Sequence, residues 1–297
     1  MTVVCGTDFS ESAARAVDAA AALARAWKVD LVLVHALEYF GADDAGAWSL
    51  LEAERGRAES GLAQEAARLA ASGVPVRVEI GIGPSDVALL GAATSRGARL
   101  LVVGALGRRG GSLWRLGSTA DRVAQTSPFP VLVVRDASSI TEWARGQRTL
   151  EVLVGIDRTP SSDAALAWVA EIESVGSCHV TCGHVYWPPE MKEKSQAGEA
   201  IPIGSGHAGH VKDLVVELRA RVAGLRGSRP FELRLLGGLG RPADHLVSIA
   251  ESAHADLVVV GANQRALLSR IWHGSVSRGV IDQAPMNVVC VTGPSEG

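Results

Sequence analysis

The sequence predicts an α/β protein of two tandem Rossmann-like domains, each a five-stranded parallel sheet with helices on both faces. Short apolar runs alternate with Ala- and Leu-rich stretches such as residues 11–27, a pattern typical of parallel sheets covered by helices. The pattern also occurs twice. Asp157 lies 149 positions after Asp8 in a similar stretch, and Gly261 lies 157 positions after Gly104 in another. One ancestral unit, copied once, explains both correspondences.

The change between the two offsets indicates a longer loop in the second copy, within residues 187–210. We expect the first domain to cover residues 1–137 and the second to cover 149–297. Residues 138–148 are the expected linker, because no apolar run there could form a strand. A chain of 297 residues has the usual length for two domains.

Ten apolar runs are the expected strands. They are residues 2–5, 31–34, 76–80, 100–103, 131–134, 152–155, 179–182, 231–236, 257–260 and 288–291. Most of these runs are continuously apolar, which is typical of strands buried on both faces. The third run of each copy alternates polar and apolar residues, so we place it at a sheet edge. The resulting strand order is 3-2-1-4-5, and ligands of such sheets bind at the switch point between strands 1 and 4.

The composition excludes several classes of function. Hydrophobic residues make up 47% and charged residues 21% of the chain, and the net charge is −3, with no basic excess for nucleic acid. No apolar run approaches the roughly 18 residues of a membrane helix, and the first residues do not resemble a secretory signal. We therefore expect a cytoplasmic protein with neither a membrane nor a nucleic-acid partner. Four cysteines fit that location as reduced thiols: Cys5, Cys178, Cys182 and Cys290.

A glycine-rich stretch after the fourth expected strand is the strongest candidate site. Residues 104–119 read GALGRRGGSLWRLGST, with twelve residues between Gly104 and Gly117, whereas connections in α/β units usually take about 2–6. Gly104 and Gly107 allow positive φ angles and bring backbone N–H groups close to a ligand. Ser118 is a natural N-cap for the next helix, whose first N–H groups carry partial positive charge. Together these groups form an expected anion cradle.

Arginines add positive charge to the same stretch, at positions 108, 109 and 115. A diphosphate or triphosphate is the ligand that this arrangement predicts. A purely structural interpretation is the alternative, because glycines often follow strands and Ser118 could serve only as a helix cap.

The glycine-rich stretch resembles the G-x2-G-x9-G-[ST] nucleotide motif of universal stress proteins and fits it without a gap. The matching residues are Gly104, Gly107, Gly117 and Ser118. Residues 7–13, TDFSESA, are similar to the first turn of that family, and residues 127–134, SPFPVLVV, resemble its closing segment. The resemblance covers nearly the whole chain as two tandem domains. It implies the adenine nucleotide α-hydrolase-like type of Rossmann-like fold.

The same resemblance implies that the first domain binds ATP, with Mg²⁺ as its companion. It places the turn with Thr7 and Asp8 near the adenosine, and the backbone at Ala36 at the adenine edge. Around the phosphates it places Gly104, Gly107, Gly117, Ser118 and Thr119, with Arg108 adding charge nearby. Asp8 also has a structural interpretation, as a cap of the first helix.

The second copy keeps Gly261, Gly274 and Ser275, but Gln264 stands where the first copy has Gly107. A side chain there costs about 1–2 kcal/mol if the backbone is left-handed, and it would occupy space near the phosphates. We therefore expect the second site to be weak or empty. Donation from the Gln264 amide to a phosphate is the alternative.

The leading functional hypothesis is a nucleotide-responsive stress or regulatory protein that acts through protein partners the sequence does not identify. Neither a Walker lysine motif nor a serine-hydrolase elbow is visible, so no catalytic residue is assigned and no enzyme is expected, although weak ATP hydrolysis stays open. A slow ATPase or nucleotidyl-transfer enzyme on the same fold, and a scaffold without nucleotide, are the alternatives. No metal site is assigned to the Cys and His pairs of residues 178–184. We expect the domains to pack as a pseudo-twofold pair and leave a homodimer of chains open.

Overall fold

The computed structural model describes residues 1–38, 45–71, 73–107, 116–186, 206–238, 240–262 and 276–293. Within these residues all ten expected strands are present. They are β1 (Thr2–Gly6), β2 (Asp30–Leu37), β3 (Val76–Ile82), β4 (Ala98–Gly104), β5 (Val131–Val134), β6 (Leu150–Gly155), β7 (Cys178–Tyr186), β8 (Glu232–Gly237), β9 (Leu257–Ala262) and β10 (Asn287–Thr292).

Helices occupy the stretches between the strands. They are α1 (Glu11–Trp27), α2 (Ala45–Ala70), α3 (Ser85–Arg96), α4 (Ser118–Thr126), α5 (Ser138–Ala144), α6 (Pro160–Glu173), α8 (Gly206–Arg226), α9 (Pro242–Ser252) and α10 (Val276–Gln283). In the part of the chain described here, no helix has the length and apolar character needed to cross a bilayer.

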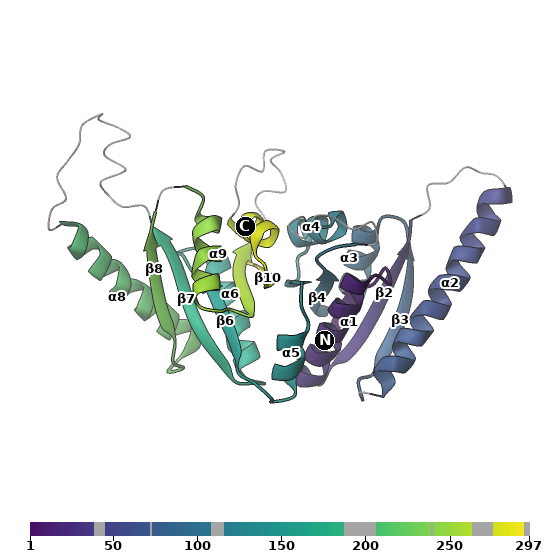
Figure 1. Ribbon diagram of the computed structural model, residues 1–297, viewed down its shortest axis with the longest axis horizontal. Helices are drawn as coiled ribbons and strands as arrows, with labels where there is room; N and C mark the ends of the chain where they lie inside the picture. The colour runs from purple at the N-terminus through teal and green to yellow at the C-terminus, as the bar shows by residue number, and fades with distance from the viewer. Residues whose placement is uncertain are drawn as a thin grey trace.

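The expected strand order 3-2-1-4-5 is confirmed in both halves, with β3 and β8 at the two edges. The sequence did not predict that the two sheets would join. β5 pairs with β10 in antiparallel fashion, so the described strands form one ten-stranded sheet (Figure 1). Leu132 pairs with Val289, its counterpart in the second copy. The local twofold relation between the halves therefore passes through this pair of residues.

The helices form one layer on each face of the sheet. One layer contains α1, α2, α5, α6 and α8, and the other contains α3, α4, α9 and α10. The apolar cluster under each layer continues from one half to the other. At the centre of the first layer, the rings of Trp27 and Trp168 meet edge to face with centroids 6.4 Å apart. Figure 1 shows α2 and α8 at the two outer ends of the molecule.

The expected linker contains an ordered helix, α5. It packs against α1 of the first half. The ring of Trp143 is fully buried and lies over Gly176 of the second half, where an added Cβ would collide with the ring. Because α5 contacts both halves, it joins them as part of the core.

Asn287, at the start of β10, holds the chain that leaves β5. Its Oδ1 accepts hydrogen bonds from the backbone N–H groups of Arg135 at 2.9 Å and Asp136 at 3.1 Å. Its Nδ2 donates to the carbonyl of Asp256 at 3.3 Å. The side chain is buried, so both halves depend on one amide for these contacts.

Replacing Asn287 by Ala should destabilise the whole chain. The variant leaves partly buried backbone groups without partners, each at a cost of up to about 1–3 kcal/mol. Urea unfolding followed by circular dichroism should show the midpoint falling, while Gln147→Ala, at an exposed side chain, stays within about 0.5 kcal/mol of the wild type. Equal midpoints for the two variants would contradict this role of Asn287.

The four cysteines are free thiols; Cys5, Cys182 and Cys290 are buried and Cys178 is half-buried. Burial raises the pKa of Cys178, Cys182 and Cys290 to about 12 and raises that of Cys5 further. The thiolate is the nucleophilic form, so these thiols are chemically inert in the folded chain.

Iodoacetamide at pH 8 should therefore label the native chain only slowly. At four pH units below a pKa of 12, roughly one thiol in ten thousand is ionised. Mass spectrometry should find all four cysteines modified after denaturation in guanidinium and little modification before it. Rapid labelling of Cys182 or Cys290 in the native chain would show that this part of the core opens readily.

Candidate functional site

The first turn of α1 lies directly against the end of β4, and this contact builds the candidate site. A Cβ on Gly104 would lie 2.7 Å from both the carbonyl oxygen and the Oγ of Ser12. Only glycine allows so close an approach of the two backbones. The Oγ of Ser12 then accepts a hydrogen bond from the N–H of Leu106 at 3.1 Å, which fixes the start of the glycine-rich loop against the helix.

Asp8 lies between this helix and the loop. Its Oδ1 accepts a hydrogen bond from the N–H of Ser10 at 3.0 Å. Its Oδ2 faces the loop, where a Cβ added to Gly107 would lie 3.4 Å away. The N-cap of α1 is Ser10, whose hydroxyl accepts from the N–H of Ala13, so the interpretation of Asp8 as the cap is wrong. Asp8 instead shapes the turn and faces the candidate phosphate loop.

The base of the loop is closed by a backbone hydrogen bond. The N–H of Gly117 donates to the carbonyl of Ala105 at 2.8 Å. Neither Gly104 nor Gly107 uses the positive φ angles that glycine allows. Space explains the glycine at 104, because Ser12 fills the position of a side chain. The arginines of the loop, at positions 108, 109 and 115, lie outside the described residues.

The N-cap of α4, the helix after the loop, is one residue earlier than the sequence predicted. Gly117 is the N-cap of α4, and Ser118, expected as the cap, is its first helical residue. Gly117 offers no side-chain acceptor to the N–H groups of the first turn, whereas α1 and α6 are capped by Ser10 and Thr159. Helix N-termini in this state attract anions, because their N–H groups and the helix dipole both favour negative charge.

Thr119 is linked to two residues that the sequence did not single out. The hydroxyl of Ser85 donates to Glu38 at 2.9 Å, so the hydroxyl of Thr119, 2.8 Å away, is the donor to Ser85. This chain joins the first turn of α4 to the end of β2. The sequence does carry one signal for Ser85: a glycine, Gly83, two residues before it. Gly83 has a φ of 107° in the turn just before α3.

A buried histidine ties the first turn to β2. His35 donates from Nδ1 to the carbonyl of Thr7 at 2.8 Å, and the ring of Phe9 stacks on it with centroids 4.7 Å apart. Ala36 follows on β2 and pairs with Gly81 of β3. The structure thus brings Thr7 and Asp8 close to the start of the glycine-rich loop and places Ala36 on the adjacent strand. Of the residues that the resemblance assigns to the nucleotide, Arg108 alone lies outside the described residues.

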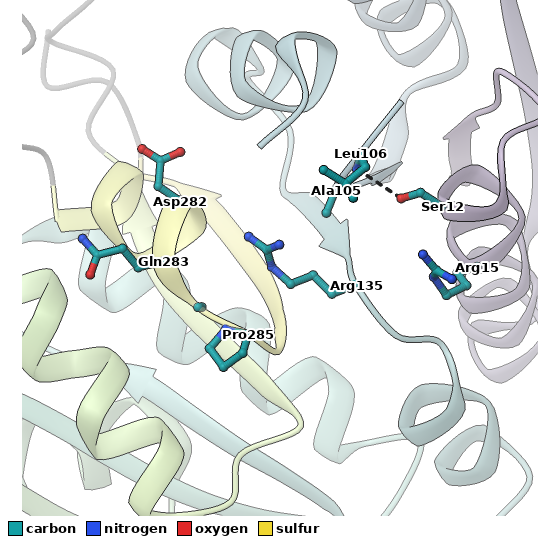
Figure 2. A pocket seen from close by; sticks show the side chains of 9 residues that line it. Ser12, Arg15, Ala105, Leu106, Arg135, Asp282, Gln283 and Pro285 are labelled. Carbon is teal, nitrogen blue, oxygen red and sulfur yellow. Dashed lines mark hydrogen bonds between the residues drawn. The ribbon is translucent and has the colours of Figure 1, made fainter. Parts of the chain in front are cut away.

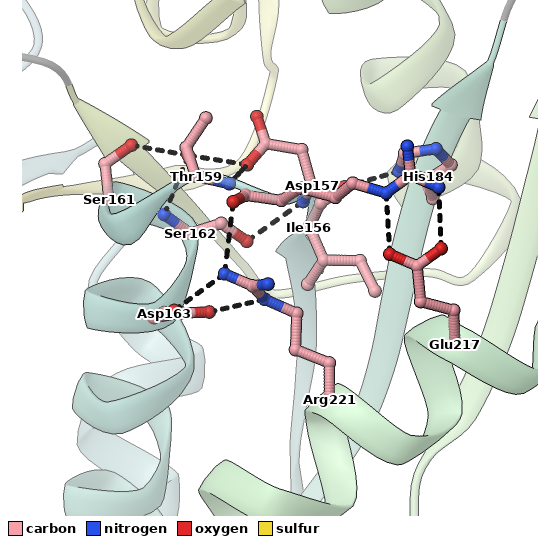
Figure 3. A network of polar contacts seen from close by, with 10 residues as sticks. Ile156, Asp157, Thr159, Ser161, Ser162, Asp163, His184, Glu217 and Arg221 are labelled. Carbon is pink, nitrogen blue, oxygen red and sulfur yellow. Dashed lines mark hydrogen bonds and ion pairs between the residues drawn. The ribbon is translucent and has the colours of Figure 1, made fainter. Parts of the chain in front are cut away.

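The second half repeats the framework of this site (Figure 3). Asp157 accepts from the N–H of Thr159 at 2.8 Å, as Asp8 accepts from Ser10. The Nδ1 of His184 donates to the carbonyl of Ile156 at 2.7 Å, and this bond corresponds to the one between His35 and Thr7. Gly261 meets the backbone of Ser161 as closely as Gly104 meets Ser12.

The surface beside that framework differs between the halves. In the first half, the ring of Phe9 lies against Gly61 of α2. In the second, Arg158 replaces Phe9 and forms two hydrogen bonds with Glu217 of α8, at 2.6 and 2.7 Å. Arg221 of the same helix pairs with Asp163 at 2.7 Å (Figure 3). An ion-pair network thus stands where the first half has an aromatic contact.

Gln264, Gly274 and Ser275 lie outside the described residues, so the loop of the second copy is known only from its sequence. The strain expected from Gln264 does not follow from the first copy, because Gly107 is not left-handed. The remaining argument for a weak second site is that the Gln264 side chain would occupy space in it. A side chain at the position of Gly107 points toward the aspartate of the first turn. In the part of the chain that is described, no three His, Cys, Asp or Glu side chains gather as a metal site would require.

Comparison with known proteins agrees with this architecture. The model of the universal stress protein family matches residues 1–135 and 150–292. Universal stress proteins of Mycobacterium bovis and Mycobacterium tuberculosis are each 28% identical over 196 residues, which is 66% of this chain and 62% of theirs. A universal stress protein from Archaeoglobus fulgidus superposes with a TM-score of 0.72 at 17% identity, over 98% of both chains. A putative universal stress protein from Pseudomonas aeruginosa gives 0.60 at 14% identity, over 98% of this chain and 93% of its own.

Gly104→Ala should disturb the site through the backbone of Ser12. The added methyl group forces α1 and β4 apart, and overpacking of this kind costs about 1–3 kcal/mol. Gly91→Ala is the matched control, because its Cβ meets no atom within 4 Å and alanine favours the helix by about 0.5–1 kcal/mol. Thermal unfolding should therefore move in opposite directions for the two variants. If Gly104→Ala were as stable as the wild type, the close packing of Gly104 on Ser12 would be contradicted.

Proposed function

Because the chain belongs to the universal stress protein family, we propose that it is an ATP-binding protein whose first half senses nucleotide for a stress or regulatory response. The family supports a stress-response role. The observation that carries the nucleotide proposal is the arrangement around Gly104. There the turn with Asp8, the start of the glycine-rich loop and the first turn of α4 converge.

The phosphates would lie at the start of α4. Gly117 adds no side-chain acceptor there, so the N–H groups of Ser118 and Thr119 are suited to phosphate oxygens. The hydrogen bond from Leu106 to Ser12 holds the loop in place before the ligand arrives. Mg²⁺ would accompany the triphosphate and be coordinated mainly by phosphate oxygens and water.

The adenosine would lie along the other side of the same turn. The carboxylate of Asp8 has the acceptor chemistry that a pair of ribose hydroxyls requires. The backbone at Ala36, on the next strand, would meet the edge of the adenine. His35 and Thr7 form a buried hydrogen bond that fixes the distance between this strand and the turn.

A bound nucleotide could influence the other half through α4. Asp121 of α4 pairs with Arg278 of α10 at 3.3 Å, across the junction of the halves. A ligand that orders the first turn of α4 would favour one geometry of this pair, and partners that prefer that geometry would bind more tightly. Ligand-dependent shape, rather than turnover, is therefore the proposed output.

ATP with Mg²⁺ should stabilise the wild-type chain and raise its melting temperature. At an ATP concentration one hundred times the dissociation constant, the free energy of unfolding should rise by about 2.7 kcal/mol. Asp8→Ala should weaken binding roughly 10- to 100-fold, because hydrogen bonds to a charged group contribute about 1.5–3 kcal/mol. Gly107→Gln, which copies the second half, should weaken ATP without lowering the stability of the free chain. Isothermal titration calorimetry measures each affinity.

Asp157→Ala is the matched control, since it removes the corresponding aspartate of the second half. It should leave the affinity for ATP within about twofold of wild type. An absence of any ATP binding at millimolar concentration would refute the proposal. Loss of binding in Asp157→Ala but not in Asp8→Ala would move the site to the second half. Steady release of phosphate by the wild type would favour the enzyme alternative.

A further inference from the structure

A cleft with a volume of about 320 Å³ lies between the two halves, beside the candidate nucleotide site (Figure 2). Its first-half wall comes from the start of α1, the start of the glycine-rich loop and the residue after β5. Its second-half wall is the end of α10 and the turn that follows. The residues that matter below are Ser12, Arg15, Leu106, Arg135 and Asp282.

Two arginines give the first-half wall its charge. Arg135 donates from Nη2 to the carbonyl of Ile281 at 2.9 Å, and Arg15 pairs with the exposed Glu11 at 2.5 Å. The Nε atoms of both arginines are buried and have no hydrogen-bond partner among the described residues. Buried guanidinium N–H groups without an acceptor are costly. These Nε atoms are themselves out of reach of a ligand, but both side chains line the cleft and that of Arg15 is 35% exposed, so an anion there would accept from their outer N–H groups.

The opposite wall carries Asp282. Burial raises the pKa of Asp282 and lowers that of Arg135, so the two groups lie in surroundings of low polarity. Charged contacts in such surroundings are stronger than at an open surface. Two arginines and one carboxylate line the cleft, and Glu11, which pairs with Arg15, is 88% exposed and therefore screened by solvent, so the lining favours an anionic ligand.

The corresponding place on the other side of the junction lacks these charges. The local twofold relation matches Arg15 with Ala164, Arg135 with Thr292, and Asp282 with Gln125. All three charged positions are therefore neutral in the other copy. If the two halves were identical, the junction would have two clefts with the same charges. Here the three charged residues line the cleft on one side of the junction, and their neutral counterparts lie on the other side.

The path of the chain also differs between the two sides. After β10, Gly293 lies against the first turn of α6, where an added Cβ would be 2.7 Å from the Cα of Ser161. After β5, the N–H groups of Arg135 and Asp136 are bonded to Asn287 of the other half. The chain after β5 is thus directed toward the second half, and the space in front of Ser12 stays open as the cleft.

We propose that this cleft binds a small phosphate-bearing anion, held by Arg15 and Arg135, at a site separate from the nucleotide cradle. Guanidinium groups match phosphate oxygens well, and the two arginines line the same cleft. The volume lies at the lower end of the range for small-molecule sites, which suits a phosphate ester of a few carbon atoms. Asp282 would accept a hydrogen bond from a hydroxyl of that ester. Because Ser12 and Leu106 line the cleft and also fix the phosphate loop, its occupant would influence nucleotide binding.

Inorganic phosphate and glycerol 3-phosphate are the probes, titrated into the full chain by calorimetry without nucleotide. We expect both to bind, and Arg135→Gln and Arg15→Gln each to weaken binding roughly 10- to 100-fold. Asp282→Asn should weaken glycerol 3-phosphate more than inorganic phosphate. Arg96→Gln removes an equally charged side chain from the far end of α3, where it pairs with Glu79, and should change neither affinity.

The same variants separate this site from the nucleotide site. Asp8→Ala should keep phosphate binding in the cleft, and Arg135→Gln should keep ATP binding within a few-fold. Binding of neither probe to the wild type would overturn the proposal, as would equal affinities in wild type and both arginine variants. Phosphate binding that survives Arg135→Gln but is lost with Gly107→Gln would place the anion in the nucleotide cradle instead. Melting curves without ligand, with Arg135→Lys as a charge-preserving variant, identify any variant that is misfolded.

Discussion

The contact between Ser12 and Gly104 is the constraint on which the candidate sites depend. A helix and a strand approach so closely that one of them must lack a side chain. On one side of this contact, the turn with Asp8 faces the start of the glycine-rich loop. On the other side, Leu106 and Ser12 form part of the cleft between the halves. The second half keeps the same close contact at Gly261 and Ser161, so both halves are built on one framework.

Joining two copies in one chain allows equivalent positions to differ. In a symmetric dimer of identical halves, residue 121 and its counterpart would carry the same charge and repel each other near the axis. Here the counterparts are Asp121 and Arg278, which attract each other. The same freedom explains why Phe9 packs on Gly61 in one half while Arg158 pairs with Glu217 in the other. It also explains why the charged cleft occurs on one side of the junction.

The sequence predicted what depends on local pattern and missed what depends on distant contacts. Continuous apolar runs and the repeated spacing were enough for the strands, their order and the position of Gly104. Gly104 does not use the positive φ angle that glycine allows; it is needed because Ser12 lies close to it, and this nearness cannot be read from neighbours in the sequence. The pairing of β5 with β10 gives no local signal, since both strands read as ordinary buried strands. Arg135 and Asp282 are single residues 147 positions apart, so only the folded chain shows that they share a cleft.

The central claim is that the first half holds a polyphosphate where the first turns of α1 and α4 converge, and that the second half has lost this capacity. A crystal structure of the full chain grown with a non-hydrolysable ATP analogue and Mg²⁺ tests it most directly. The account predicts one analogue per chain, with its phosphates at the N–H groups of Ser118 and Thr119 and its ribose at Asp8. An analogue bound beside Asp157, with the first half free of ligand, would contradict it.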